Sequence, residues 1–210
     1  MEMPKYLQKW LVKPITAIID TREQNPLQLT RYVPDLAEEH ASLAHGDYSL
    51  SYPNMQLDIC IERKSKDDLV QSIMKDCVGE DETINNFKKT LLAMRGYKYK
   101  MVIVEGTIGE VMRGEYHSKI NPNSVMGFIS YWMGVQGVPF LFAESHAGAS
   151  YIVARMLYNI AIREIKLSLL AGRMFPGMSV DQLRLLGNVG KDTKEDVVNF
   201  YDEVLSTHSF

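Results

Sequence analysis

Short apolar runs that close in an acidic residue constrain the fold of this chain more than any other feature. Their length and their β-branched side chains are typical of buried strands. The strands predicted in this way cover residues 15–20, 57–62 and 101–105, with a bent or bulged strand over 41–52 and a short one over 139–143. Apolar residues at helical spacing predict helices over residues 67–74, 83–94, 123–136 and 149–170. Strands that alternate with helices indicate an α/β fold in which helices cover both faces of a sheet.

The pattern changes after about residue 170. Glycine and proline residues become frequent, and they separate two short predicted helices at 180–186 and 193–205. No further strand is predicted. We therefore divide the chain into an α/β domain over residues 15–170 and a small all-α tail over residues 171–210.

Composition limits the class of protein. With 46% hydrophobic and 23% charged residues, the chain is typical of a globular protein. The formal net charge of -3 gives no overall basic signature, so a nucleic-acid enzyme would have to concentrate Lys and Arg locally. The two cysteines form no Cys/His cluster, which argues against a zinc site and fits a reducing compartment. No apolar run is long enough to span a bilayer. We expect an intracellular protein with no membrane partner, in the cytoplasm of a bacterial or virus-infected cell or in a eukaryotic nucleus.

Acidic residues and a lysine fall where the predicted strands end. Glu62 and Lys64 are two residues apart on one strand, so both side chains can point to the same place, and the carbonyl of Arg63 is a further oxygen donor. A hairpin would bring Asp47 beside Glu62, and Asp20 could approach from the first strand. Oxygen donors suit Mg²⁺ or Mn²⁺. Such a cation would activate water for phosphodiester hydrolysis.

The acid-x-lysine triplet alone is weak, because such triplets are common on solvated strand edges. Asp68 also has a simpler explanation, since an acidic residue stabilises the first turn of a helix. The full set of charged residues at the ends of apolar strands is more specific. It is the combination of Asp20, Asp47, Glu62, Lys64 and Asp68 that predicts a metal-dependent nuclease.

These residues resemble the XPF-type family of structure-specific endonucleases, whose signature is Glu-Arg-Lys, three free positions and Asp. The signature occurs here over residues 62–68, and residues 19–23 and 46–50 resemble the family's first strand and its Gly-Asp-Tyr hairpin. The resemblance covers about residues 15–163. It implies a restriction-endonuclease-like fold, with a central mixed sheet flanked by helices, and a catalytic set that comprises Asp20, Asp47, Glu62, Arg63, Lys64 and Asp68.

The resemblance also implies individual roles. Asp47, Glu62 and the Arg63 carbonyl would be metal ligands, with Asp20 as an additional acid of the metal site. Lys64 would orient or activate the attacking water. Arg63 and Asp68 would support the site, and Arg22 would contact a phosphate. Glu105 is expected to be structural.

Members of this family often carry helix-hairpin-helix modules after the nuclease. In such modules the backbone amides of a glycine turn, beside a helix N-terminus, hold a phosphate. The tail has room for one hairpin rather than the usual two, and ordinary glycine turns in a small helical cap are the alternative. The expected DNA-binding residues there are Gly177, Gly187, Gly190, Lys191 and Lys194.

The sequence therefore predicts a metal-dependent DNA endonuclease. By resemblance, its substrate would be branched DNA (flaps, forks or Holliday-type junctions) during repair, recombination or replication, and it would act as a homodimer or with a related subunit. Two alternatives remain: a non-catalytic DNA-binding partner subunit, and a different restriction-like nuclease. A basic cluster over residues 88–100, with Tyr97 and Tyr99 interleaved, could follow a phosphate backbone or form a solvated surface.

Overall fold

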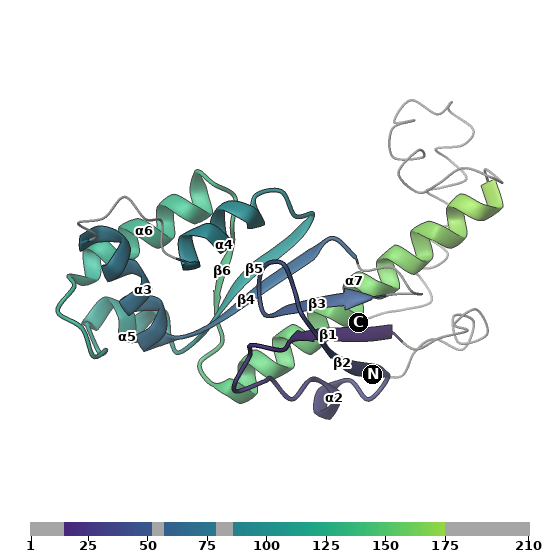
Figure 1. Cartoon of the computed structure of the whole chain (residues 1–210), viewed down its shortest axis with the longest axis horizontal. Coiled ribbons are helices and arrows are strands. Elements are labelled where there is room, and N and C mark those ends of the chain that lie inside the picture. The colour runs from purple at the N-terminus through teal and green to yellow at the C-terminus, as the bar shows by residue number, and fades with distance from the viewer. Residues whose placement is uncertain (1–14, 52–56, 79–85, 175–210) are drawn as a thin grey trace. The chain divides into compact units, whose positions relative to one another are not determined.

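The computed structural model describes residues 15–51, 57–78 and 86–174. Within these residues, six strands form one sheet in the order β2-β1-β3-β4-β5-β6 (Figure 1). The strands are β1 (Ile15–Asp20), β2 (Leu36–Ala41), β3 (Tyr48–Ser51), β4 (Ile59–Ser65), β5 (Tyr99–Glu105) and β6 (Phe140–Phe142). The sheet is mixed, because β3 runs antiparallel to both β1 and β4 while the β1–β2, β4–β5 and β5–β6 pairs are parallel. This confirms the predicted mixed sheet.

Four helices cover one face of the sheet. They are α3 (Lys66–Val78), α4 (Asn86–Met94), α5 (Ile108–Arg113) and α6 (Pro122–Gly134), and they gather beside β4 and β5 in Figure 1. Their buried residues, among them Leu69, Leu91 and Trp132, pack in one cluster with Cys60, Val102 and other residues of the sheet. The side chains of β4 and β5 alternate between the two faces, so this cluster also fixes which residues of β4 point toward the helices.

The remaining long helix is α7 (His146–Met174), and its part up to Ala161 lies on the other side of β4 and β5 in Figure 1. Its first turns contact the segment after β1, where Ser150 Oγ accepts a hydrogen bond from the Gln28 backbone at 3.1 Å. The short helix α2 (Leu29–Tyr32) leads into β2. Tyr48 is completely buried, and its hydroxyl accepts a hydrogen bond from the Leu27 backbone at 2.8 Å, which ties this segment to β3.

The predicted elements differ from the structure mainly at their ends. The strand expected over residues 41–52 corresponds to β3 alone, which begins at Tyr48, and β2, which ends at Ala41, was not predicted. The intervening turn contains Gly46 at φ 74°, which breaks the extended conformation. The short helices α2 and α5 were not predicted, since four and six residues give little periodicity to detect.

The chain divides into two compact units, residues 1–161 and 162–210. The second unit is described only as far as Met174, so the predicted domain boundary near residue 170 stays a prediction. The hairpin residues proposed for the tail, Gly177, Gly187, Gly190, Lys191 and Lys194, lie outside the described residues. In the part of the chain that is described, no helix is both long enough and apolar enough to cross a membrane.

Candidate active site

Asp47 is fixed between the first and fourth strands by its own backbone. Its N–H donates to the Ile61 carbonyl of β4 at 2.7 Å, and its carbonyl accepts from the Asp20 N–H at 2.8 Å. Gly46 makes this approach possible, because a Cβ atom there would lie 2.7 Å from Cys60 Sγ and 2.9 Å from the Ile61 carbonyl oxygen. The expected hairpin between the Gly46 segment and β4 is present, with Tyr48 opposite Ile61.

Glu62 and Lys64 lie on the face of β4 that α3, α4, α5 and α6 cover. The Lys64 ammonium is 3.1 Å from Glu62 Oε1, and it lies over the Phe87 ring of α4, 5.2 Å from the ring centre. Glu62 is buried, with 7% of its surface exposed. The two side chains therefore share one face, as their spacing predicted, and one of the two is a nearly buried carboxylate.

The electrostatics of this cluster disfavour two ionised acids. Burial, together with the nearby charge of Glu62, raises the pKa of Asp47 to about 7. Burial also raises the pKa of Glu62, against the opposing effect of the Lys64 charge. The Lys64 charge lowers the pKa of both acids but does not offset the cost of burying two carboxylates. Buried carboxylates in this condition are typical of functional sites and of cation sites in particular.

Arg63 contributes its backbone to the site, while its side chain points to the opposite face. Its N–H donates to Asp47 Oδ2 at 2.7 Å. In a strand of an antiparallel pair, the N–H and C=O of one residue point toward the same neighbour. The Arg63 carbonyl therefore faces the side on which Asp47 lies, where the β3–β4 ladder has already ended. The expectation that this carbonyl is a third oxygen donor fits the arrangement.

Asp20 is fully buried and its carboxylate is occupied by hydrogen-bond donors. Arg22 binds it through its backbone N–H, Nε and Nη2 at 2.7 to 2.9 Å, and the Leu43 N–H binds it at 2.7 Å. The hydrogen bonds from Arg22 lower the pKa of Asp20 to about 2, although burial opposes them. Here Asp20 joins two loops and holds the guanidinium of Arg22 near the acids. Its predicted part in metal binding, and that of Arg22 in phosphate binding, stay predictions.

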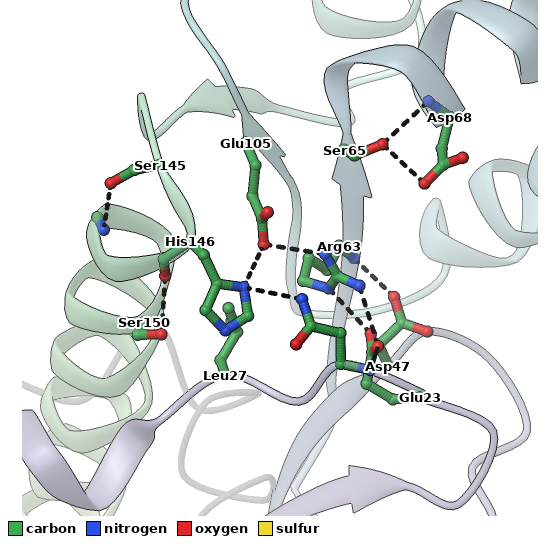
Figure 2. Close-up of polar contacts among 12 residues, drawn as sticks. Glu23, Leu27, Asp47, Arg63, Ser65, Asp68, Glu105, Ser145, His146 and Ser150 are labelled. Atoms are coloured by element: carbon green, nitrogen blue, oxygen red, sulfur yellow. Dashed lines mark hydrogen bonds and ion pairs between the residues drawn. The ribbon is translucent and has the colours of Figure 1, made fainter.

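Asp68 lies in the first turn of α3, the helix that follows β4. The Ser65 hydroxyl donates to Asp68 Oδ2 at 2.7 Å, and it accepts from the Asp68 N–H at 3.1 Å (Figure 2). This reciprocal pair satisfies groups at the N-terminus of α3 that have no partner within the helix. The geometry makes Ser65 the cap of α3 and Asp68 the first-turn acid that holds the Ser65 hydroxyl, and the catalytic part of Asp68 stays a prediction.

Comparison with known proteins follows the same residues. The model of the ERCC4 domain matches residues 19–156 of the 210. The chain belongs to the ERCC4 domain family. Its fold is similar to that of XPF from Aeropyrum pernix, at 18% identity and a TM-score of 0.51 over 79% of this chain and 76% of that one. A second structure, of that archaeal XPF in complex with DNA, gives 17% identity and a TM-score of 0.52 over 80% and 78% of the two chains. No curated protein matches the chain.

The oxygen donors of this ERCC4 domain suit a hard divalent cation. Among the described residues, no three His, Cys, Asp or Glu side chains are grouped as a metal site. Asp47, Glu62 and the Arg63 carbonyl supply two carboxylates and one neutral oxygen. Mg²⁺ is commonly held by one or two carboxylates, with water and substrate phosphate completing its octahedron. The residues present therefore fit Mg²⁺ or Mn²⁺ without a third acid.

Sequence reasoning missed the residues that anchor Arg63 in this ERCC4 domain. Figure 2 shows its guanidinium between Glu23 and Glu105, with His146 beyond Glu105. Glu105 was expected to be structural, and no role was predicted for Glu23 or His146. The contacts join positions about 40 residues apart, so no local pattern could have indicated them.

Proposed function

We propose that this ERCC4 domain is a metal-dependent endonuclease that hydrolyses DNA phosphodiester bonds. The observation that carries the proposal is the pair of acids, Asp47 and Glu62, beside Lys64 at the edge where β3 begins. Burial, together with the charges of neighbouring acids, raises the pKa of both groups, so ionising both is unfavourable without a cation. A bound divalent cation supplies the compensation, and the chain offers oxygen donors of the kind such a cation prefers.

The chemistry divides among few groups. Asp47, Glu62 and the Arg63 carbonyl would hold Mg²⁺ or Mn²⁺, which when bound supplies an activated water and neutralises charge developing on the phosphate. Lys64 is held close by Glu62, so its ammonium is placed to orient that water and to stabilise negative charge. Arg22, whose side chain is 68% exposed, would extend from Asp20 to a DNA phosphate.

The substrate proposed is branched DNA: a flap, a fork or a Holliday-type junction. Support comes from the signature over residues 62–68 and from the DNA complex of the archaeal XPF, which is a property of that protein. We also propose a dimer, with a second copy or a related subunit. Exposed apolar side chains lie on α6, the turn after it and the edge strand β6, namely Tyr131, Met133, Val135 and Leu141. Such residues are typical of a protein interface.

A cleavage assay with matched variants tests the function. Wild type, Glu62→Gln and Glu39→Gln would be incubated with labelled flap, fork, junction and linear duplex DNA, in Mg²⁺, Mn²⁺ or EDTA. Glu39 is an exposed acid of β2, so its substitution removes the same charge without touching the site. We expect metal-dependent cleavage of branched substrates by wild type and Glu39→Gln. The cleavage rate of Glu62→Gln should fall at least about a hundredfold, because substitution of even the groups that hydrogen-bond to a metal ligand lowers activity by up to that factor.

Binding measured in parallel separates the alternatives. If the wild type binds DNA tightly but cleaves none of the substrates in either metal, the protein is a non-catalytic subunit. Equal cleavage of linear and branched DNA would identify a different kind of restriction-like nuclease. Equal cleavage by wild type and Glu62→Gln would contradict the assignment of the site itself.

A further inference from the structure

The side chain of Arg63 is held by carboxylates on the face of the sheet opposite Glu62 and Lys64. Its Nε and Nη2 donate to the two oxygens of Glu23, each at 3.0 Å, and its Nη1 donates to Glu105 Oε1 at 2.9 Å. Only 13% of the Arg63 side chain is exposed, against 6% of Glu23 and 15% of Glu105. A guanidinium bound in a fork geometry by one acid and anchored by another is rigid and unavailable to a phosphate.

The network continues from Glu105 to the start of α7. His146, the first residue of that helix, places its Nδ1 atom 2.8 Å from Glu105 Oε1 (Figure 2). Glu23 is also fixed, because its Oε1 accepts from the Asn25 N–H at 2.8 Å and its own N–H donates to the Asp20 carbonyl at 3.0 Å. Two segments therefore bind the guanidinium directly, the turn after β1 and the end of β5, and the first turn of α7 joins them through Glu105.

The consequence for the site passes through the backbone of Arg63. Its N–H makes the one hydrogen bond recorded to the Asp47 carboxylate among the described residues, at 2.7 Å. A side chain that is anchored at its far end limits rotation of its own peptide, and with it the direction of that N–H and of the Arg63 carbonyl. Anchoring on one face thus orients two oxygen donors at the edge of the other.

We propose that Glu105 and His146 are positioning residues: acting through Arg63, they fix the Asp47 carboxylate and the Arg63 carbonyl for a divalent cation. The inference rests on the proposed function of the same site. Neither residue touches the acids of the site, so their effect is on the geometry of the donors rather than on their chemistry. Losing the anchor should weaken cation binding, while the affinity for DNA should remain unchanged.

The test compares Glu105→Ala and His146→Ala with wild type. Glu110→Ala is the control, because Glu110 is also a partly buried acid, paired with Lys66 at 2.7 Å, in a helix cap away from the site. Mn²⁺ affinity would be measured by calorimetry on the DNA-free protein, and the KM for DNA and the Mn²⁺ concentration for half-maximal cleavage would be measured separately. We expect the dissociation constant for Mn²⁺ to rise about tenfold in Glu105→Ala, less in His146→Ala and not at all in the control.

A second readout needs no metal. In the metal-free protein, the Arg63 amide proton should resonate downfield because it donates to Asp47, and this shift should diminish in Glu105→Ala. Glu105→Gln, which keeps an acceptor for Arg63, should restore most of it if Glu105→Ala proves unstable. Folded variants with wild-type Mn²⁺ affinity and an unmoved Arg63 amide would overturn the proposal and leave the nuclease function intact. Failure of the wild type to bind Mn²⁺ or to cleave would instead overturn the nuclease function.

Discussion

Asp47→Asn should make the metal-free protein more stable at pH 8. The wild-type carboxyl has a pKa of about 7 in the folded protein against an ordinary value of 3.8. Below pH 3.8 both folded and unfolded chains carry the proton, so the site has no effect on stability. Between these two values the unfolded chain has released the proton and the folded chain retains it, so wild-type stability falls as pH rises. Above pH 7 the loss is constant.

The size of the effect follows from the same difference in pKa. About three pKa units at about 1.4 kcal/mol each give an upper limit of about 4 kcal/mol at pH 8. Neutralising Asp47 removes both the cost of burying its charge and the repulsion from Glu62, but the asparagine amide has its own cost of burial, so we expect a gain of about 1 to 2 kcal/mol. The asparagine oxygen can still accept the hydrogen bond from the Arg63 N–H, so the substitution should remove charge without removing that contact.

Urea unfolding in EDTA at pH 4 and pH 8 would measure this gain. The difference between Asp47→Asn and wild type should be small at pH 4 and grow toward pH 7, whereas Glu39→Gln, at an exposed position, should show no such trend. Added Mg²⁺ should then stabilise wild type and leave Asp47→Asn unchanged, because the variant has lost one of the two carboxylates. A gain of equal size at both pH values would refute the reasoning, since it would not come from ionisation.

Three further substitutions test other parts of the structure. Gly46→Ala should cost more than about 1 kcal/mol of unfolding free energy and reduce cleavage, because its Cβ would meet Cys60 Sγ and the Ile61 carbonyl at a φ of 74°; urea unfolding and the cleavage assay check both, and an unaffected protein would contradict the close approach. Ser65→Ala should lose about 1 kcal/mol as α3 loses its cap, with little effect on Mn²⁺ affinity; a large loss of affinity would instead assign Asp68 to the metal site. Val135→Asp should convert a dimer to a monomer in light scattering, and a dimer of unchanged stability would show that the partner binds elsewhere.

The sheet could be predicted because its strands carry their own pattern. Apolar runs that end in Asp20, Glu62 and Glu105 identified β1, β4 and β5, and the hairpin between Gly46 and β4 followed from their nearness in sequence. The strand β2 was not predicted, because its composition is mostly polar. Its pattern runs from a buried Leu36 to exposed Glu38, Glu39 and His40, because it lies at the edge of the sheet. Local patterns do not show which strand ends at an edge.

The candidate site could be predicted only in part, for a related reason. Glu62 and Lys64 share a face because of strand periodicity, which is visible in the sequence. The same periodicity requires that Arg63 points away, but the partners on the other face come from distant segments, and nothing local indicates Glu23 or His146. The state of Asp20 was equally hidden, since the donors that occupy its carboxylate come from Arg22 and from Leu43, 23 residues away.

The signature from Glu62 to Asp68 thus carries two kinds of information. Glu62 and Lys64 face the candidate site. The Arg63 side chain instead binds Glu23 and Glu105 on the other face, and Asp68 with Ser65 starts α3. Selection for folding and selection for cleavage would act on different residues of the same seven-residue signature. A relative that no longer cleaves DNA would be free to lose its counterparts of Glu62 and Lys64 while keeping those of Arg63 and Asp68. The two structural residues of the signature would then remain because the fold requires them, and their presence alone would not indicate catalysis.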